Sequence, residues 1–173
     1  MAIWFTSDQH FGHENIIKYC SRPFASIEEM DEYLIANWNS TVDEDDVVWH
    51  LGDLSYKASG EYVRSIIARL NGFIHMLCLP WHHDKQWMSE VGDIDNLRFE
   101  KPLVAYPFSG TPVITMSHYP LASWEASFHG AWHLHGHSHG MYSAKGKILD
   151  VGVDNHNYFP ISLERVKELM KTR

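Results

Sequence analysis

The chain of 173 residues contains 45% hydrophobic and 13% aromatic side chains, a composition typical of a packed globular protein and not of a disordered one. Its net charge of −8 argues against a broad nucleic-acid-binding or membrane-binding surface, because such surfaces are rich in Lys and Arg. At this length we expect one domain spanning residues 1–173.

The N-terminal sequence predicts no targeting segment. Residues 1–5 carry no basic cluster, no long apolar run follows them, and no stretch reaches the roughly 18 apolar residues of a membrane-spanning helix. We therefore expect a cytoplasmic protein. Cys20 and Cys78 lie far apart and in no metal-binding spacing, which predicts buried free thiols in a reducing compartment.

Apolar runs and turn residues predict the following elements in chain order. We expect strands at residues 3–7, 47–51, 73–79, 113–117, 131–135 and 148–153. We expect helices at residues 14–19, 27–39, 61–70 and 163–170. Ser26 is the expected N-cap of the second helix, Glu29 completes a capping box, and Gly72 is the expected C′ residue of the third helix. Helices are concentrated in the first half and strands in the second, which favours an α/β (α+β) fold with two sheets packed face to face and helices outside.

Histidine is unusually abundant in this chain. Thirteen histidines stand against 14 Lys and Arg, and four of them fall within residues 133–139. Histidine is a common ligand of transition metals through a neutral ring nitrogen. A single histidine more often belongs to the core or the surface, so a metal role depends on matching ligands elsewhere in the chain.

Metal-competent side chains follow five of the predicted strands. They are Asp8 and His10, Asp53, residues 82–84, His118, and His137 with His139. In open α/β sheets, the ligand crevice lies outside the carboxyl ends of the strands, where loops from distant parts of the sequence converge. Asp and His without a shared function would be scattered with respect to the strand ends. The pattern therefore predicts a metal centre at this edge.

The number of ligands favours two metal ions over one. The six candidates are Asp8, His10, Asp53, His118, His137 and His139. One ion that keeps a position open for water needs fewer ligands than this. Asp53 stands alone after its strand, as a bridging carboxylate would. Two ions roughly 3.5–4 Å apart can activate a hydroxide and stabilise the attacking and leaving oxygens, so the residues alone predict a dinuclear metal hydrolase.

These residues resemble the motifs of the calcineurin-like metallophosphoesterases. The matching blocks are Asp8-x-His10, Gly52-Asp53, the block ending at His83-Asp84, His118, and Gly136-His137-x-His139, in the order and approximate spacing of that family. The resemblance runs from residue 8 to about residue 160, and the longer strings at residues 8–15 and 50–53 are similar to small bacterial and phage phosphoesterases. It implies two mixed sheets flanked by helices, a four-layer αββα sandwich.

The resemblance also implies how the metal ligands are shared. Asp8, His10 and His139 would hold the first metal, and His118 and His137 the second, with Asp53 between them. Mixed nitrogen and oxygen ligands suit two divalent ions of manganese first, with iron or zinc as alternatives, better than magnesium or calcium.

The catalytic residues that the resemblance implies are His83 and Asp84. His83 would donate a proton to the leaving oxygen or stabilise charge on the phosphoryl group, and Asp84 would fix its tautomer and raise its basicity. The sequence departs from the family just before them, where Trp81 and His82 stand in place of glycine and asparagine. Either His82 is a ligand of the second metal, or the second site is weakened and the protein is a slow enzyme or a binding module that has lost catalysis.

Two residues near the first motif are candidates for contact with the substrate phosphate. His13 lies one short turn beyond His10, and Arg22 has the planar guanidinium suited to bidentate phosphate contact. An ordinary loop histidine and a surface charge are the alternatives. His50, His133 and His135 are expected in the core or behind the ligands.

The sequence therefore predicts a metal-dependent phosphoesterase in which a hydroxide bridging two ions attacks phosphorus in line. The expected partner is a phosphorylated small molecule or a nucleotide, as monoester or diester, and no membrane is expected. A nuclease of the same fold stays open, since the acidic net charge does not prevent local contacts with a nucleic acid.

Overall fold

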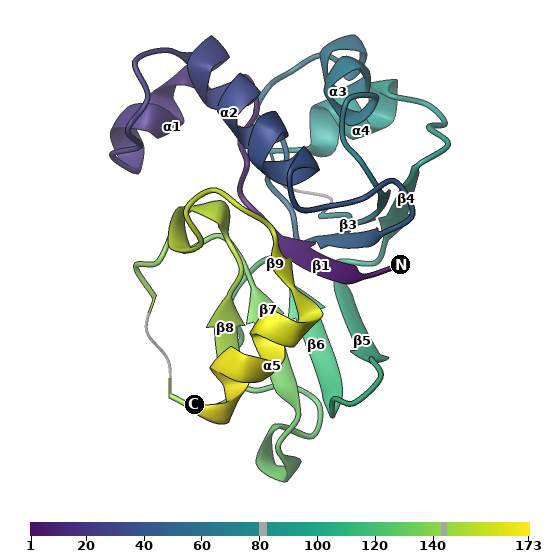
Figure 1. The fold of residues 1–173 in the computed structure, drawn as a ribbon, viewed down its shortest axis with the longest axis vertical. Helices are drawn as coiled ribbons and strands as arrows, with labels where there is room; N and C mark the ends of the chain where they lie inside the picture. Colours follow the sequence, from purple (N-terminus) through teal and green to yellow (C-terminus); the bar gives the residue numbers. More distant parts are fainter. Residues whose placement is uncertain (80–82, 143–144) are drawn as a thin grey trace.

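Two β-sheets pack against each other in the computed structural model, which describes residues 1–79, 83–142 and 145–173 (Figure 1). The first sheet has the strand order β4-β3-β2-β1-β9 and the second the order β5-β6-β7-β8. The strands of the first sheet are β1 (Ile3–Thr6), β2 (Val47–His50), β3 (Phe73–Leu77), β4 (Leu97–Glu100) and β9 (Ile161–Ser162). Those of the second are β5 (Leu103–Pro107), β6 (Val113–Ser117), β7 (Trp132–His135) and β8 (Ile148–Asp150).

Both sheets are mixed. Strands β1 to β4 run parallel and β9 runs antiparallel to β1, while β6, β7 and β8 run parallel and β5 runs antiparallel to β6. In the register of the first sheet, Thr6 pairs with His50 and His50 with Met76, so β1, β2 and β3 end at one edge. A parallel bridge between Ser7 and Gly152 joins that edge to the end of β8. The loops that leave both sheets therefore meet at one place.

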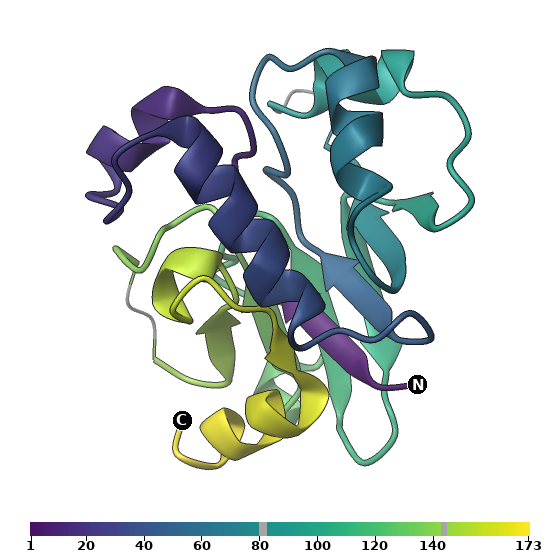
Figure 2. The same ribbon diagram turned by 45° about the horizontal axis from the view of Figure 1, so that its top comes forward.

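Five α-helices occur in the described residues. They are α1 (Glu14–Tyr19), α2 (Ile27–Asn39), α3 (Gly60–Ile67), α4 (Lys85–Glu90) and α5 (Leu163–Lys171), with short 3₁₀ turns η1 (Ser127–His129) and η2 (Val153–Asn155). Helices α1 to α4 gather on one side of the first sheet, with the second sheet on its other side, and α2 runs across the first sheet over β1 (Figures 1 and 2). None of the helices in the described part of the chain is both long and apolar enough to cross a membrane.

Two apolar cores hold these layers together. The first lies between the helices and the first sheet and contains Met30, Leu34 and Trp38 of α2, which the periodicity predicts as the buried face. The second lies between the two sheets and also takes in Leu163, Val166 and Met170 of α5. The outer face of the second sheet is covered at His133 by the segment before β7, since Leu121 donates its N–H to His133 Nε2 and Trp124 packs on the same ring.

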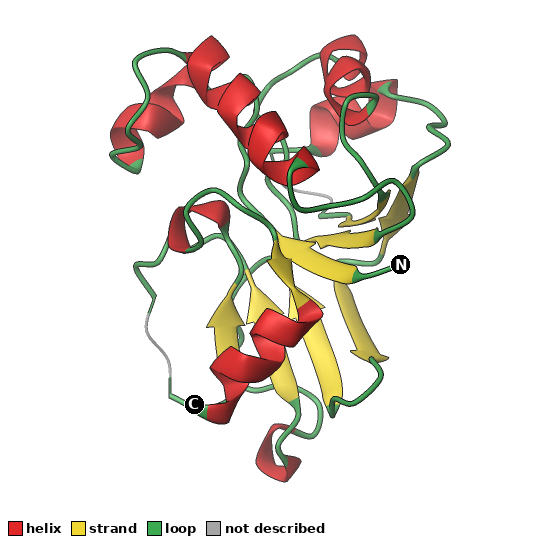
Figure 3. Ribbon diagram, viewed as in Figure 1, coloured by secondary structure: helices red, strands yellow, loops and turns green. Residues whose placement is uncertain are grey.

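The predicted α+β class with two mixed sheets flanked by helices is confirmed (Figure 3). The Ser26 cap is also confirmed, since its hydroxyl accepts the N–H of Glu29, but the Glu29 carboxylate accepts the N–H of Ala25 instead of that of Ser26. Among the described residues, four of the five α-helices precede residue 91 and six of the nine strands follow it, as predicted. Gly72 is no helix C′ residue, because α3 ends at Ile67; its positive φ serves the turn into β3.

Strands β4 and β5 and helix α4 escape the sequence prediction. β4 and β5 carry partly exposed side chains and no clean alternation, and β5 ends at Pro107, which removes a ladder donor at a sheet edge. Helix α4 has six residues, which is too short to show a helical period. Both cysteines are free, in agreement with the prediction, but they are half-buried where the sequence predicts burial.

Candidate metal centre

The six predicted ligands converge into two groups at the shared edge of the sheets. Ligand atoms of Asp8, His10 and His139 lie within 4.8 Å of one another, and so do those of Asp53, His118 and His137. The two groups have the membership that the sequence predicts for two metals. The remaining predicted ligand, His82, lies outside the described residues.

Asp53 stands between the two groups. Its Oδ2 lies 3.5 Å from His10 Nε2 of the first group and 3.5 Å from His118 Nε2 of the second. All three side chains are buried. His10 Nε2 has no hydrogen-bond partner within the described part of the chain, which is rare for a buried ring nitrogen and fits a position that a cation would occupy.

The backbone at these residues is strained. Asp8, His10, Asp53, His137 and His139 all have positive φ, between 46° and 66°. Residues other than glycine rarely adopt this left-handed region, and such strain collects at functional sites where the surrounding structure holds it in place. Because of these left-handed turns, His137 and His139, which are separated by one residue, belong to different ligand groups.

Close-packed side chains leave room only for glycine at two positions of the site. A Cβ on Gly136 would lie 2.1 Å from Ser7 Oγ and 2.6 Å from Asp8 Oδ2. A Cβ on Gly52, which has φ of 111°, would lie 2.8 Å from His118 Nδ1. The glycines in Gly52-Asp53 and Gly136-His137 therefore permit the approach of the ligands.

Hydrogen bonds orient two of the imidazoles. His118 Nδ1 donates to the carbonyl of Leu51 at 3.0 Å, which leaves Nε2 directed at Asp53. His139 Nδ1 lies 2.7 Å from Asp154 Oδ2, so its Nε2 is the atom available to the first group. A ring nitrogen bonded to a carboxylate or carbonyl is the usual support of a metal-bound histidine.

Burial and neighbouring charges shift the pKa values of all three residues of the first group. Burial, together with the nearby Asp53 and Asp150, raises the pKa of Asp8 to about 8. Burial acts to lower the pKa of His139, but its hydrogen bonds to Asp154 and Cys20 and the charge of Asp8 outweigh this and raise it to about 10. Burial and the positive charge of Arg22 hold the pKa of His10 well below its usual range, so this ring is neutral, as a ligand must be.

Arg22 is predicted to contact the substrate phosphate, but its guanidinium is directed into the interior. Its side chain is buried, its Nε and Nη2 donate to both oxygens of Asp154 at 2.8 Å, and its remaining donors reach the carbonyls of Asp8 and Gln9. The Arg22 guanidinium donates its hydrogen bonds to groups inside the protein. Moving it outward would leave the Asp154 carboxylate and the backbone carbonyls without these partners. Its position behind the Asp8 loop makes it a support of the first group.

Asp154 is a site residue that sequence reasoning missed. It pairs with Arg22 on one side and with His139 on the other, and these contacts hold its pKa below the usual value despite burial. The thiol of Cys20 lies close to His139 and Asp154, since the ligand atoms of these three residues are within 4.8 Å of one another. Nothing in the sequence near Asp154 marks it, because its partners are distant along the chain.

Asp84 holds the loop that carries Asp53. Its carboxylate accepts hydrogen bonds from the backbone N–H groups of Asp53, Leu54 and Ser55 and from Trp87 Nε1. These four hydrogen bonds tie Asp84 to the Asp53 loop and to α4, while the role of Asp84 in fixing the tautomer of His83 stays a prediction. The carboxylate positions the bridging candidate through its backbone.

His83 and His13 both line a cavity of about 460 Å³ that opens onto His10, Asp53, His137 and His139. The His83 ring lies 6.1 Å from that of His10, and His13 Nδ1 lies 3.5 Å from His10 Nδ1. The structure thus brings both residues to the predicted site. Tyr56, which the sequence did not single out, lies between them, with its ring 4.2 Å from His13 and 4.6 Å from His83.

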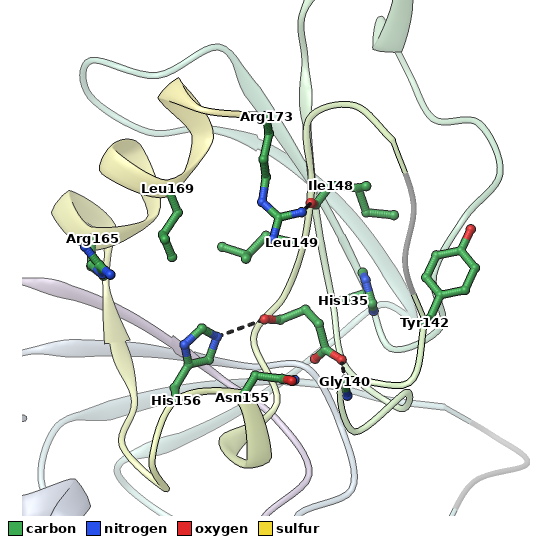
Figure 4. A pocket seen from close by; sticks show the side chains of 11 residues that line it. His135, Gly140, Tyr142, Ile148, Leu149, Asn155, His156, Arg165, Leu169 and Arg173 are labelled. Carbon is green, nitrogen blue, oxygen red and sulfur yellow. Dashed lines mark hydrogen bonds between the residues drawn. The ribbon is translucent and has the colours of Figure 1, made fainter.

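A separate cavity of about 420 Å³ lies between α5 and β8 (Figure 4). It is behind the loop after β7 that carries His137 and His139, which we call the ligand loop. Asp150 forms part of the cavity wall and reaches the ligand loop from there, accepting hydrogen bonds from Ser138 Oγ and the N–H of Gly140. His156 Nε2 bonds to the carbonyl of Asp150. Asp150 therefore fixes the turn that contains His139.

The remaining predicted histidines lie behind the site. His50 is buried, with Nε2 2.6 Å from Gln9 Oε1, and His133 and His135 are buried on β7. Burial lowers the pKa of His50 and of His133 to about 4 each. All three sit on strands that carry the ligand loops, as the sequence predicts for supporting or core residues.

Comparison with known proteins places the chain among uncharacterized relatives. No family model matches it. It is 34% identical to the uncharacterized protein MJ1445 of Methanocaldococcus jannaschii over an alignment of 177 residues, which covers 98% of this chain and 91% of that protein. A shorter match of 53 residues, 47% identical, links 30% of this chain to 25% of the gene 66 protein of Mycobacterium phage L5.

Among solved structures, the chain shares its fold with AQ665 of Aquifex aeolicus, a protein of unknown function. The TM-score is 0.72 at 22% sequence identity, and the match covers 97% of this chain and 98% of that one. The sequence relationship is the stronger of the two, and on it the chain belongs to the family of the uncharacterized protein MJ1445.

Proposed function

We propose that the chain is a dinuclear metal-dependent phosphoesterase with a metallophosphoesterase-type αββα fold. The observation that carries the proposal is the place of Asp53 Oδ2, 3.5 Å from a ring nitrogen of each ligand group. A buried carboxylate oxygen shared by two sets of ligands is what a pair of adjacent divalent ions requires. A structural ion pair would need only one of the two histidines.

The donor set fits two divalent transition metals. Each group offers imidazole nitrogen and carboxylate oxygen, which suits manganese, iron or zinc better than calcium or magnesium. Once bound, two such ions would lower the pKa of water and neutralise charge on a phosphoryl group. The exposed side of His137 and the cavity lined by His13 and His83 leave an approach for the substrate.

The reaction is the hydrolysis of a phosphate ester. Water adds to phosphorus, the bond from phosphorus to the ester oxygen breaks, and the products are an alcohol and a phosphate. His83 lies at the cavity wall in a position to donate the proton that the leaving oxygen takes up. His13, on the same wall, is placed to hydrogen-bond a phosphate oxygen.

The test is hydrolysis of p-nitrophenyl phosphate and bis(p-nitrophenyl) phosphate by protein loaded with manganese. We expect turnover of at least one ester, lost after chelation and restored by manganese. A His83→Ala variant should keep its metal content and lose most of the turnover. Absence of turnover of either ester by protein that holds two metal ions would overturn the proposal.

A further inference from the structure

Another cavity, distinct from the one between α5 and β8 and here called the second cavity, adjoins the cavity that opens onto the candidate metal ligands. It has a volume of about 540 Å³ and is lined by Tyr56, Lys57, His83, Lys85, Gln86 and Ser89. Tyr56 and His83 also line the cavity that opens onto the ligands. The two cavities therefore share a wall of two aromatic rings, and one molecule can extend from the metal ligands past this wall into the second cavity.

The lining of the second cavity suits an anion. Lys57 and Lys85 contribute two ammonium groups, Gln86 an amide and Ser89 a hydroxyl, and none of its described lining residues is acidic.

The shared wall also holds one of the lysines in place. Lys57 has a φ of 51°, and its Nζ lies 5.1 Å from the centre of the Tyr56 ring. Tyr56 in turn stands edge-on to His83, with ring centres 4.6 Å apart. A cation over an aromatic face is attracted by the ring, so the turn at residues 56–57 orients Lys57 next to the path from one cavity to the other.

We propose that Lys57 and Lys85 bind a second phosphate group of the substrate. The inference rests on the proposed function, in which the first phosphate lies at the metal ligands. Because Tyr56 and His83 line both cavities, we assign a substrate whose two phosphates are joined by a spacer that passes these rings, such as a nucleoside bisphosphate. Two lysines in a chain of net charge −8 favour such a small molecule over a nucleic acid strand, which needs an extended basic surface.

The first experiment compares ligands that differ by one phosphate group. Adenosine 3′,5′-bisphosphate and adenosine 5′-monophosphate are titrated into manganese-loaded protein by calorimetry, and both are tested as competitors of p-nitrophenyl phosphate hydrolysis. We expect the bisphosphate to bind at least about tenfold more tightly, the preference that two added lysine contacts would give. Equal affinities would overturn the proposal.

The second experiment locates the preference. In the Lys57→Gln, Lys85→Gln double variant the ratio of the two dissociation constants should fall to within twofold of one, while the double Arg variant should retain the preference. Lys171→Gln, at an exposed position near the end of α5, is the matched control and should keep the wild-type ratio. Both lysines of the site are exposed, so their replacement leaves the core intact.

The outcomes separate this inference from the proposed function. Binding that prefers the bisphosphate through the two lysines, without turnover of any ester, would support the second site and overturn the phosphoesterase. Turnover of an ester, with an unchanged ligand preference in the double variant, would support the phosphoesterase and overturn the second phosphate site. A short oligonucleotide that binds more tightly than the bisphosphate would show that the natural ligand is a strand and overturn the small-molecule assignment.

Discussion

Asp84 and Asp53 are joined by a hydrogen bond in which the backbone N–H of Asp53 donates to Asp84 Oδ2 at 2.8 Å. The other oxygen of Asp84 accepts the N–H of Ser55 and the indole N–H of Trp87. A buried carboxylate with these contacts ties the loop after β2 to helix α4. The conformation of the bridging candidate therefore depends on a residue 31 positions away.

Replacing Asp84 by Asn should destabilise the protein by about 2–4 kcal/mol, because an amide cannot accept all four bonds and turns a donor toward buried N–H groups. Urea unfolding of metal-free protein measures the loss. Asp93→Asn, at an exposed position, is the matched control and should be neutral. An Asp84→Asn variant of unchanged stability, altered only in the pH dependence of activity, would instead place Asp84 with His83.

Replacing Asp53 by Asn should abolish both metal occupancy and activity. The amide keeps the shape of the side chain but removes the charge that lies between His10 and His118. Metal content per chain, measured by mass spectrometry after gel filtration, should fall from the two ions expected of the wild type to none. Retained activity in this variant would show that Asp53 is not the bridge.

Replacing Arg22 by Gln should cost about 3–5 kcal/mol of folding free energy, since it strands the buried carboxylate of Asp154. Arg22→Lys keeps the charge but loses the bidentate contact, and should lie between this variant and the wild type. Thermal and urea unfolding give both values. A raised KM for a phosphoester with unchanged stability would restore Arg22 to the role of a substrate contact.

Replacing Asp154 by Asn should weaken the first metal site about 10–100-fold, the usual effect of removing the carboxylate behind a metal-bound histidine. The physical cause is that Asp154 orients His139 through Nδ1. Competition with a coloured chelator measures the affinity of each ion. Asp95→Asn, an exposed carboxylate, serves as the control; equal metal affinities in the two variants would contradict this role.

Stability should fall as the pH drops from 6.5 to 4, and His133 should carry part of this loss. Burial lowers the pKa of His133 to about 4 in the folded protein, whereas in the unfolded chain it stays near 6.5. Between these values the unfolded state binds a proton that the folded state does not, so acid favours unfolding, by at most about 3 kcal/mol. Urea unfolding with a chelator at pH 7 and pH 4.5 should show a smaller difference for His133→Gln. Identical pH dependence in the variant would contradict the assignment.

The ligand positions could be predicted from sequence because they obey a local rule. Asp8, Asp53, His118 and His137 each follow a strand within three residues, and strands that run parallel in one sheet end at one edge. The amphipathic face of α2 and the cap at Ser26 are local in the same sense. These features need only the order of residues over one or two turns of chain.

The supports of the site could not be predicted in this way. Arg22 and Asp154 are 132 positions apart, and neither carries a sign of the other until the fold brings them together. Asp84 stands next to His83 in the sequence, and only the fold shows that its carboxylate also accepts the N–H of Asp53. Tyr56, Lys57 and Lys85 form one cavity only because α4 packs beside the turn that follows Asp53.

The sequence by itself determined which side chains could bind metal and that strand ends carry them, because strand periodicity and residue chemistry are written locally. Only the tertiary structure decided that Asp53 Oδ2 lies 3.5 Å from a histidine of each group. The tertiary structure also directs the Arg22 side chain into the interior and places the Asp84 carboxylate against the loop that carries Asp53. The physical reason is that hydrogen bonds between distant segments depend on sheet register and helix packing, which no short stretch of sequence specifies.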